Sequence, residues 1–286
     1  MGNRIVGNVA GGIAVGKSVD STVAKNHVIG SPETEAGGIH IANGDRNTTV
    51  VKNVLRSIPE GVSALEVEDN SIDTTVAGND LVDTWLGVYV ENTPGTKILS
   101  NDVSRAGFAG MFMFGPKQAN NATVLANHVS GADFGFLVAN SHGGSFAANE
   151  LYNNCAGVVF ISTFGGPVGD YEVKGNTVTD NTRSCPADQG NAAFSGIGIA
   201  LLGAHDMEVT ANHLSGNVPS GPTAVSGGVV VAKDPIFGGT TKPRNNTVSA
   251  NYFGRNKPDI FWDKSGTGNV FRANLCDTSV PSSLCN

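Results

Sequence analysis

Residues 76–91, VAGNDLVDTWLGVYVE, hold the two short patterns that decide the fold. The first pattern is an apolar residue, two variable residues, an asparagine, one further residue and a second apolar residue, here running from Val76 to Leu81 around Asn79. The second is a glycine followed by alternating apolar residues, here Gly87-Val88-Tyr89-Val90. Such alternation is typical of a β-strand with one buried face.

Both patterns recur along nearly the whole chain. Copies of the first surround Asn8, Asn26, Asn53, Asn79, Asn101, Asn127, Asn149, Asn176, Asn212, Asn251 and, weakly, Asn274. Most neighbouring asparagines lie 22 to 27 residues apart, and intervals of 36 and 39 residues indicate two long loops. One period holds two or three short strands and has no room for a helix. The repeat therefore predicts a solenoid of stacked parallel strands and excludes leucine-rich and helical repeats.

Composition agrees with a folded, turn-rich chain. Among 286 residues there are 38 Gly and 12 Pro, while charged residues make up 15% and apolar residues 40%. These values exclude a coiled coil and a disordered chain. No apolar run is long enough to span a membrane, and residues 1–10 contain no block that resembles a secretory signal. The net charge of −7, with no basic cluster, argues against a nucleic-acid partner.

The paired motif, an asparagine turn followed one strand later by Gly-apolar-x-apolar, resembles the right-handed parallel β-helix family of pectate lyases and alginate epimerases. The resemblance implies an all-β fold, a single-stranded right-handed parallel β-helix of about 10–11 coils over residues 3–275, with residues 276–286 as a C-terminal capping segment. It also implies that the asparagines stack in a structural ladder, so none is assigned to a site. In this family the outer face of the first sheet forms the floor of the substrate cleft.

The four cysteines favour disulfides over a zinc ribbon, because no C-x-x-C pair is present. Cys155 and Cys185 follow asparagine turns on neighbouring coils, and Cys276 and Cys285 bracket a short segment after the last coil. We predict these two bridges, which place the protein in a secreted or otherwise extracytoplasmic compartment, its signal segment not being present in this chain. The open alternative is four reduced thiols in a cytoplasmic protein.

The N-terminal end is a second open question. The repeat is already running by Ile5, and no amphipathic helix precedes it to cover the first coil. An uncovered end exposes unpaired strand edges. We expect either a trimmed chain or self-association through this end.

The register predicts two outward columns on the first sheet, because equivalent positions of successive coils stack about 4.8 Å apart. One column is Ala14, His40, Glu66, Tyr89, Phe112, Leu137 and Val159; the other is Gly16, Ala42, Glu68, Glu91, Phe114, Ala139 and Ile161. Polar groups gather in adjacent coils, and both columns are apolar further on. We expect that apolar stretch to bind a partner or to lie under a loop.

Candidate site residues follow from these columns and the adjoining loops. The catalytic candidates are His40, Glu66, Tyr89 and Glu91; the substrate-binding candidates are Arg46, Trp85, Arg105, Phe112 and Phe114; and Glu68 with Glu91 are the candidate metal ligands, for calcium. Flat rings that stack on sugar faces, mixed with groups that bind hydroxyls, favour an oligosaccharide or polysaccharide partner.

The preferred mechanism is abstraction of the proton next to a uronate carboxylate, the reaction of a polysaccharide lyase or epimerase. Tyr89 or His40 would be base and donor, and an arginine or calcium would neutralise the acid group. A diagonal of about 8 Å between Glu66 and Glu91 suits an inverting glycoside hydrolase instead. A non-catalytic glycan-binding or surface repeat protein and a small-molecule enzyme using the same groove also stay open. The Asp-Pro-His run of the resembling epimerases and the paired Asp and Arg-x-Lys motifs of polygalacturonase-like hydrolases are missing, so no specific activity is carried over.

Overall fold

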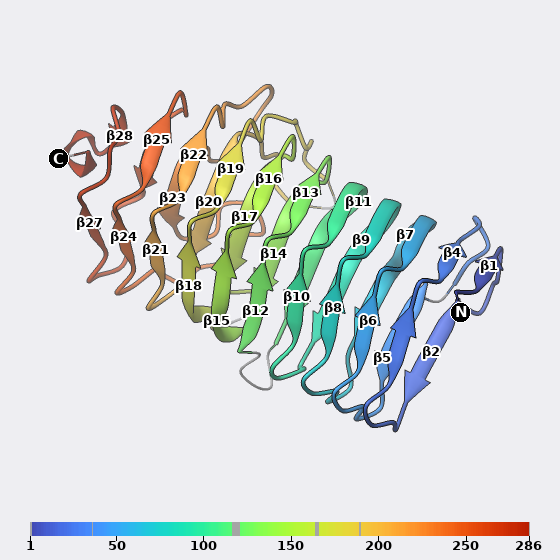
Figure 1. Cartoon of the computed structure of the whole chain (residues 1–286). Helices are drawn as coiled ribbons and strands as arrows, with labels where there is room; N and C mark the ends of the chain where they lie inside the picture. The colour runs from blue at the N-terminus through green and yellow to red at the C-terminus, as the bar shows by residue number, and fades with distance from the viewer. Residues whose placement is uncertain (1, 36, 116–120, 164–165, 189, 286) are drawn as a thin grey trace.

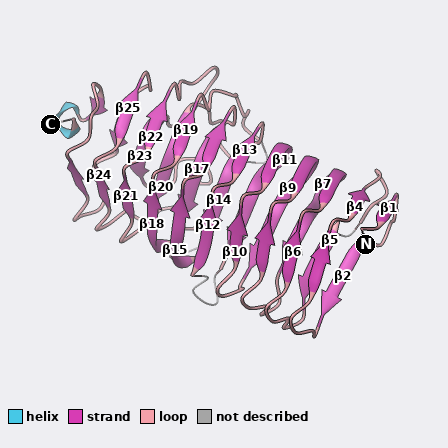
Figure 2. Ribbon diagram, in the orientation of Figure 1, coloured by secondary structure: helices cyan, strands magenta, loops and turns pink. Residues whose placement is uncertain are grey.

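The chain coils around one axis as a parallel β-helix (Figure 1), in a computed structural model that describes residues 2–35, 37–115, 121–163, 166–188 and 190–285. Each strand pairs in parallel with its equivalents in the neighbouring coils. Strands and loops make up the described residues except for the short 3-10 helix η1 (Ser282–Leu284) beside the C-terminus (Figure 2). Among these residues, no helix has the length and apolarity to cross a membrane.

Three faces, here numbered sheets 1 to 3, run along the helix. Sheet 1 contains β2 (Ile13–Gly16), β5 (Ile39–Ala42), β14 (Phe134–Ala139), β17 (Ala156–Ile161), β20 (Ile197–Leu202), β23 (Gly227–Ala232), β26 (Ile260–Trp262) and β28 (Ser279–Val280). Sheet 2 contains β3 (Thr22–Ala24), β6 (Thr49–Val51), β8 (Thr75–Ala77), β10 (Lys97–Leu99), β12 (Ala122–Leu125), β15 (His142–Ala147), β18 (Gly169–Lys174), β21 (Glu208–Thr210), β24 (Thr247–Ser249) and β27 (Val270–Arg272).

Sheet 3 contains β1 (Arg4–Val6), β4 (His27–Ile29), β13 (His128–Ser130), β16 (Glu150–Tyr152), β19 (Thr177–Thr179), β22 (His213–Ser215) and β25 (Tyr252–Gly254). Three longer strands, β7 (Val54–Val67), β9 (Asp80–Glu91) and β11 (Asp102–Phe114), run through sheet 3 and continue into sheet 1. A register shift interrupts the pairing at the bend, for example between Ile58 and Ser63 of β7. These continuous strands carry most of the candidate site.

An asparagine ladder runs inside the turn between sheets 2 and 3. In each step, the backbone N–H and the side-chain Nδ2 of one asparagine donate to Oδ1 of the next, as Asn101 does to Asn127 at 2.9 and 3.0 Å. The predicted ladder is confirmed from Asn26 to Asn274. The first member is Asn3, however, which donates to Asn26. The prediction that Asn8 belongs to the ladder is wrong. The asparagines that stack lie directly before a sheet 3 strand, and Asn3 has that position before β1.

A second ladder, not predicted, lies between sheets 3 and 1. It links Asn154, Asn181, Asn217 and Asn256 and ends on Asp259. Each of these asparagines comes five residues after a member of the first ladder, so a search for that offset in the sequence would have found them.

Two cores stabilise the solenoid. The first fills its interior with inward side chains such as Leu65, Val88 and Phe160. The second lies outside sheet 1, from β14 onward, where the loops after β19 and β23 cover the apolar columns with Phe194 and Ile236. The predicted long loops therefore cover the predicted apolar surface.

The C-terminal segment packs on the last coil. Strand β28 pairs with β26, and the side chain of Leu284 joins the interior core. The predicted disulfide between Cys276 and Cys285 is present in this segment. Residue 286 of the predicted capping segment lies outside the described residues.

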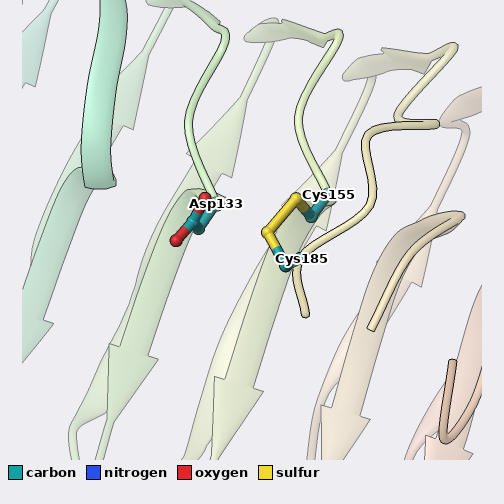
Figure 3. A group of neighbouring side chains, drawn as sticks. All are labelled: Asp133, Cys155 and Cys185. Atoms are coloured by element: carbon teal, nitrogen blue, oxygen red, sulfur yellow. A yellow bond between two sulfur atoms is a disulfide. The ribbon is translucent and has the colours of Figure 1, made fainter. Parts of the chain in front are cut away.

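The predicted disulfide between Cys155 and Cys185 is also present, and Asp133 of the preceding coil lies beside it (Figure 3). A carboxylate oxygen of Asp133 and both sulfur atoms lie within 4.8 Å of one another. Both sulfurs belong to the bridge, so they are not free to bind a metal. Burial raises the pKa of Asp133 to about 6, although Arg183 opposes that shift.

We expect Asp133→Asn to stabilise the protein at pH 7.5 and to leave its stability at pH 4 nearly unchanged. The folded pKa lies above the usual unfolded value, so the stability that the protonated acid contributes is present below about pH 4 and is lost as pH rises through about 6. The variant stays neutral throughout. Thermal unfolding at both pH values measures the effect, with exposed Asp102→Asn as the control. A Tm difference between variant and parent that does not change with pH would contradict this expectation.

Candidate functional site

The candidate site lies on the outer face of sheet 1, across β5, β7, β9 and β11. His40 pairs with Glu66, Glu66 with Tyr89 and Tyr89 with Phe112. The column continues through Leu137 and Val159. The predicted register is confirmed, because side chains alternate strictly between the interior and the outer face of each strand.

Three glutamates and a histidine form a carboxylate cluster, defined here as Glu66, Glu68 and Glu91 with His40. Nε2 of His40 lies 2.7 Å from Oε1 of Glu68 and 3.9 Å from Oε2 of Glu66. The side chains of Glu66 and Glu68 are only 22% and 24% exposed. Burial raises the pKa of Glu66, the charge of Glu68 and then that of Glu91 add to the effect, and His40 opposes it. Glu66 is therefore the member of the cluster best suited to carry a proton.

Tyr89 donates its phenolic proton to Glu91, with 2.7 Å between the phenol oxygen and Oε2. Nδ2 of Asn92 donates to the other oxygen of Glu91 at 3.2 Å. The pKa of Tyr89 is raised far above its usual range by burial and then by this hydrogen bond. The phenol is thus a donor at neutral pH, and its hydrogen bond orients the side chain of Glu91. Asn92 was not predicted, although it directly follows Glu91 in the sequence.

An aromatic groove of about 350 Å³ adjoins the cluster and shares Tyr89 with it. The floor comes from β9, β11, β14 and β17. The ring of Phe112 lies 5.4 Å from that of Tyr89 and 6.2 Å from that of Phe114, measured between centroids. The groove is lined by Tyr89, Phe108, Phe112, Phe114, Leu137, Ala139, Ile161, Thr163 and Phe237.

Phe237 lines the groove, with its ring 6.1 Å from that of Phe134, and was not predicted. It lies in the loop after β23, within the 39-residue interval between Asn212 and Asn251. That interval indicated a long loop, but nothing in the sequence places Phe237 beside Ile161, which lies 76 residues earlier in the chain.

The predicted wall residues flank sheet 1: Trp85 and Arg105 lie within β9 and β11 where these strands enter it, and Arg46 lies in a turn that leaves it. Trp85 stacks on Phe108 at the edge of the groove, with 5.9 Å between ring centroids. Arg105 forms a bidentate ion pair with Asp83 at 2.6 and 2.9 Å, and both side chains are exposed. Arg46 is exposed in the turn toward sheet 2, where its backbone bridges Val19 and Ile72.

Seven of the predicted site residues therefore lie together on the outer face of sheet 1, whereas the two arginines lie away from the carboxylate cluster. His40, Glu66, Glu68, Tyr89, Glu91, Phe112 and Phe114 share one face. Within the described part of the chain, the ion pair recorded for Arg105 is with Asp83, and neither arginine pairs with the carboxylate cluster.

The arrangement offers both acid–base chemistry and cation binding. Glu66 can supply a proton, while Glu91 can accept one. One ligand atom each from His40, Glu66 and Glu68 lies within 4.8 Å of the others, a separation that a bound cation can bridge. The carboxylate oxygens suit calcium, whereas the histidine nitrogen suits a transition metal better.

Comparison with known proteins places this fold. The family model described as "Right handed beta helix region" matches residues 61–234. No curated protein sequence matches the chain.

Solved structures with the same fold cover most of the chain at low sequence identity. DFA-IIIase from Arthrobacter chlorophenolicus A6, crystallised without its lid, has a TM-score of 0.63 and 14% identity over 87% of this chain and 63% of its own. The periplasmic alginate epimerase AlgG has a TM-score of 0.53 and 12% identity over 88% of this chain and 70% of its own. The Dettilon tailspike protein has a TM-score of 0.56 and 12% identity over 92% of this chain and 60% of its own. The chain thus spans 63% of the length of DFA-IIIase, and these likenesses show the fold alone.

Proposed function

The chain belongs to the right-handed β-helix family, and from that premise we propose that it is a carbohydrate-active enzyme that cleaves a glycan bound along the outer face of sheet 1. One observation carries the proposal. Glu66 is a largely buried carboxyl with a raised pKa, it stands beside a carboxylate held by two donors, and both adjoin an aromatic groove. A neighbouring structure that is named an alginate epimerase supports a carbohydrate substrate.

The reaction that this geometry supports best is hydrolysis by general acid–base catalysis. Glu66 would protonate the glycosidic oxygen, and Glu91 would take a proton from the attacking water. The two residues lie on adjacent strands, on columns two residues apart, so the diagonal between their backbone positions is about 8 Å. That separation is in the range of inverting glycoside hydrolases, in which a water molecule fits between base and sugar. Tyr89 acts as a positioning residue, because its hydrogen bond to Oε2 fixes the orientation of the Glu91 carboxyl group.

The sugar that we propose is a neutral one. The carboxylate cluster carries three carboxyl groups against one histidine, and Arg105 is already neutralised by Asp83. A polyuronate would meet like charge at the cluster, whereas a neutral sugar would meet hydrogen-bond acceptors there and rings in the groove. Phe112 and Phe114 would stack on sugar faces next to the cleavage point.

A second candidate is a calcium-dependent uronate lyase or epimerase. The observation in its favour is the close approach of ligand atoms from His40, Glu66 and Glu68, with Glu91 on the next strand. Calcium bound there would reverse the local charge and attract a uronate carboxylate. Calcium held by the carboxylates of Glu68 and Glu91 would leave His40 outside its coordination, free to act as the base, because Tyr89 keeps its proton.

We also propose that the enzyme works outside the cytoplasm. Two disulfides hold its four cysteines, and disulfides persist in oxidising compartments. A structural neighbour named as periplasmic agrees with this assignment.

The test of the proposed function is product analysis on neutral oligosaccharides and on uronate polymers, with calcium and with a chelator. We expect saturated reducing ends from a neutral glycan, equally with and without calcium. We expect Glu91→Gln to lower kcat by at least 100-fold and Tyr89→Phe by about tenfold, because the first removes the base and the second only its hydrogen bond.

Three outcomes separate the candidates. An unsaturated, ultraviolet-absorbing product that depends on calcium assigns the lyase. Uronate epimerisation without cleavage assigns the epimerase. If no glycan is turned over and neither variant changes glycan binding, the groove is not the site and a non-catalytic role takes its place.

A further inference from the structure

We propose a transition-metal site, for zinc or a similar divalent ion, formed by His142, Asp170 and His205 at the start of three successive sheet 2 strands. One ligand atom from each side chain lies within 4.8 Å of the other two. The site is separate from the carboxylate cluster, because it lies along β15, β18 and the turn before β21. It does not depend on the proposed glycan reaction.

The two histidines converge although their backbones are two coils apart. His142 pairs with Gly169, and Gly169 bridges to His205 in the next coil, which separates the two histidine backbones by about 9.6 Å. The ring centroids are nevertheless only 5.3 Å apart. The ring of His205 therefore lies over the intervening glycine, close to the ring of His142.

Gly169 is what permits this approach. A Cβ added to that residue would lie 2.4 Å from the backbone oxygen of His205 and 2.6 Å from both Nδ1 and Cε1 of its ring, so both the backbone and the ring would have to move. The absence of a side chain in the middle coil leaves the space that the imidazole occupies. The next residue, Asp170, has a φ of +61°, in the left-handed region, and its carboxylate lies 3.2 Å from Nδ1 of His142.

The donor set and its geometry suit zinc. Zinc binds histidine nitrogen and carboxylate oxygen at about 2.0 to 2.1 Å in a tetrahedral arrangement, so neighbouring ligand atoms stand about 3.3 Å apart. The distance between His142 and Asp170 already meets that value. Small side-chain rotations close the remaining edges, and a water molecule would take the fourth position.

The orientation of His205 is fixed by a second carboxylate. Nδ1 of His205 lies 2.8 Å from Oδ2 of Asp206, which leaves Nε2 for the metal. Metal-bound histidines usually donate their other ring N–H to a carboxylate in this manner. The side chain of His205 is only 12% exposed, so the ring is held in place. Arg244 forms a parallel β-bridge with His205 from the next coil. The carboxylate of Asp206 interacts with the charge of Arg244 and so reduces its repulsion of a bound cation.

Titration calorimetry with zinc chloride alone tests the site. We expect the parent chain to bind zinc. His142→Ala and His205→Ala, tested separately, should each lose the same single equivalent. Asp206→Ala, which removes the orienting carboxylate and its hydrogen bond from Asn245 but no proposed metal ligand, should weaken that equivalent by about tenfold. The matched control is His128→Ala, which removes an exposed histidine that also faces a carboxylate, at 3.5 Å from Glu150. His40→Ala shows whether any of the zinc binds to the carboxylate cluster, and this contribution is subtracted from the total.

Two further readouts do not depend on enzyme activity. Cobalt substituted for zinc should show the intense visible absorption of a tetrahedral complex, and His205→Ala should abolish it. Zinc at 100 times its Kd should raise the Tm of the parent by about 5 °C and that of His142→Ala by much less. If both histidine variants bind the same number of zinc equivalents as the parent, with the same Kd, the proposed site is wrong.

Discussion

Glu66→Gln is expected to lower kcat for glycan cleavage by about 1,000-fold while leaving the fold and glycan binding intact. General acid catalysis typically contributes between 100-fold and 10,000-fold, and the amide cannot supply the proton. Glu60→Gln is the matched control, because Glu60 lies on the same strand, β7, and is exposed. An unchanged kcat in Glu66→Gln would remove Glu66 from the mechanism.

The pH profile gives this prediction a second readout. Glu66 must be protonated to act as the acid, so kcat should fall as pH rises through its raised pKa. In Glu66→Gln, the residual kcat should no longer fall over this pH range. The defect should also shrink with aryl glycosides, because a good leaving group needs no protonation. A defect of equal size on both kinds of substrate would mean that Glu66 has another role.

The second large effect is expected from Asn127→Ala in the middle of the first ladder. The side chain of Asn127 accepts two hydrogen bonds from Asn101 and donates to the carbonyl of Ile98. Asn101 and Asn127 are almost completely buried, so the substitution leaves donors without acceptors and without water. We expect a loss of about 3 kcal/mol in the free energy of unfolding, which corresponds to a fall in Tm of about 6 to 10 °C.

Asn274→Ala supplies the control within the same ladder. Asn274 also accepts from its predecessor, Asn251, at 3.0 and 3.1 Å, but it is the last member of the ladder and is only half-buried. Water can replace part of what its side chain provides, so the loss should be much smaller. Equal losses at the two positions, or an unchanged Tm for Asn127→Ala, would contradict the structural role assigned to the ladder. Chemical denaturation and calorimetry measure both variants.

Much of the fold was predictable from sequence because each coil repeats the same local physics. Alternating side chains identify which residues face outward, and parallel stacking places equivalent positions side by side. That is why the column from His40 to Phe112 could be predicted. The first asparagine was assigned wrongly, to Asn8 in place of Asn3, because near the chain end only one neighbouring coil constrains the register.

The sequence by itself determined the solenoid, its register and the residues that share its first face, since these depend on a repeated local pattern. Only the tertiary structure decided which partners those residues have. His40 lies against Glu68, Tyr89 donates to Glu91, and Arg105 pairs with Asp83. It also placed Phe237 over the groove and brought His142 and His205 together across Gly169. Such contacts depend on side-chain rotamers and loop paths, which are set by packing between residues far apart in the sequence and leave no periodic signal.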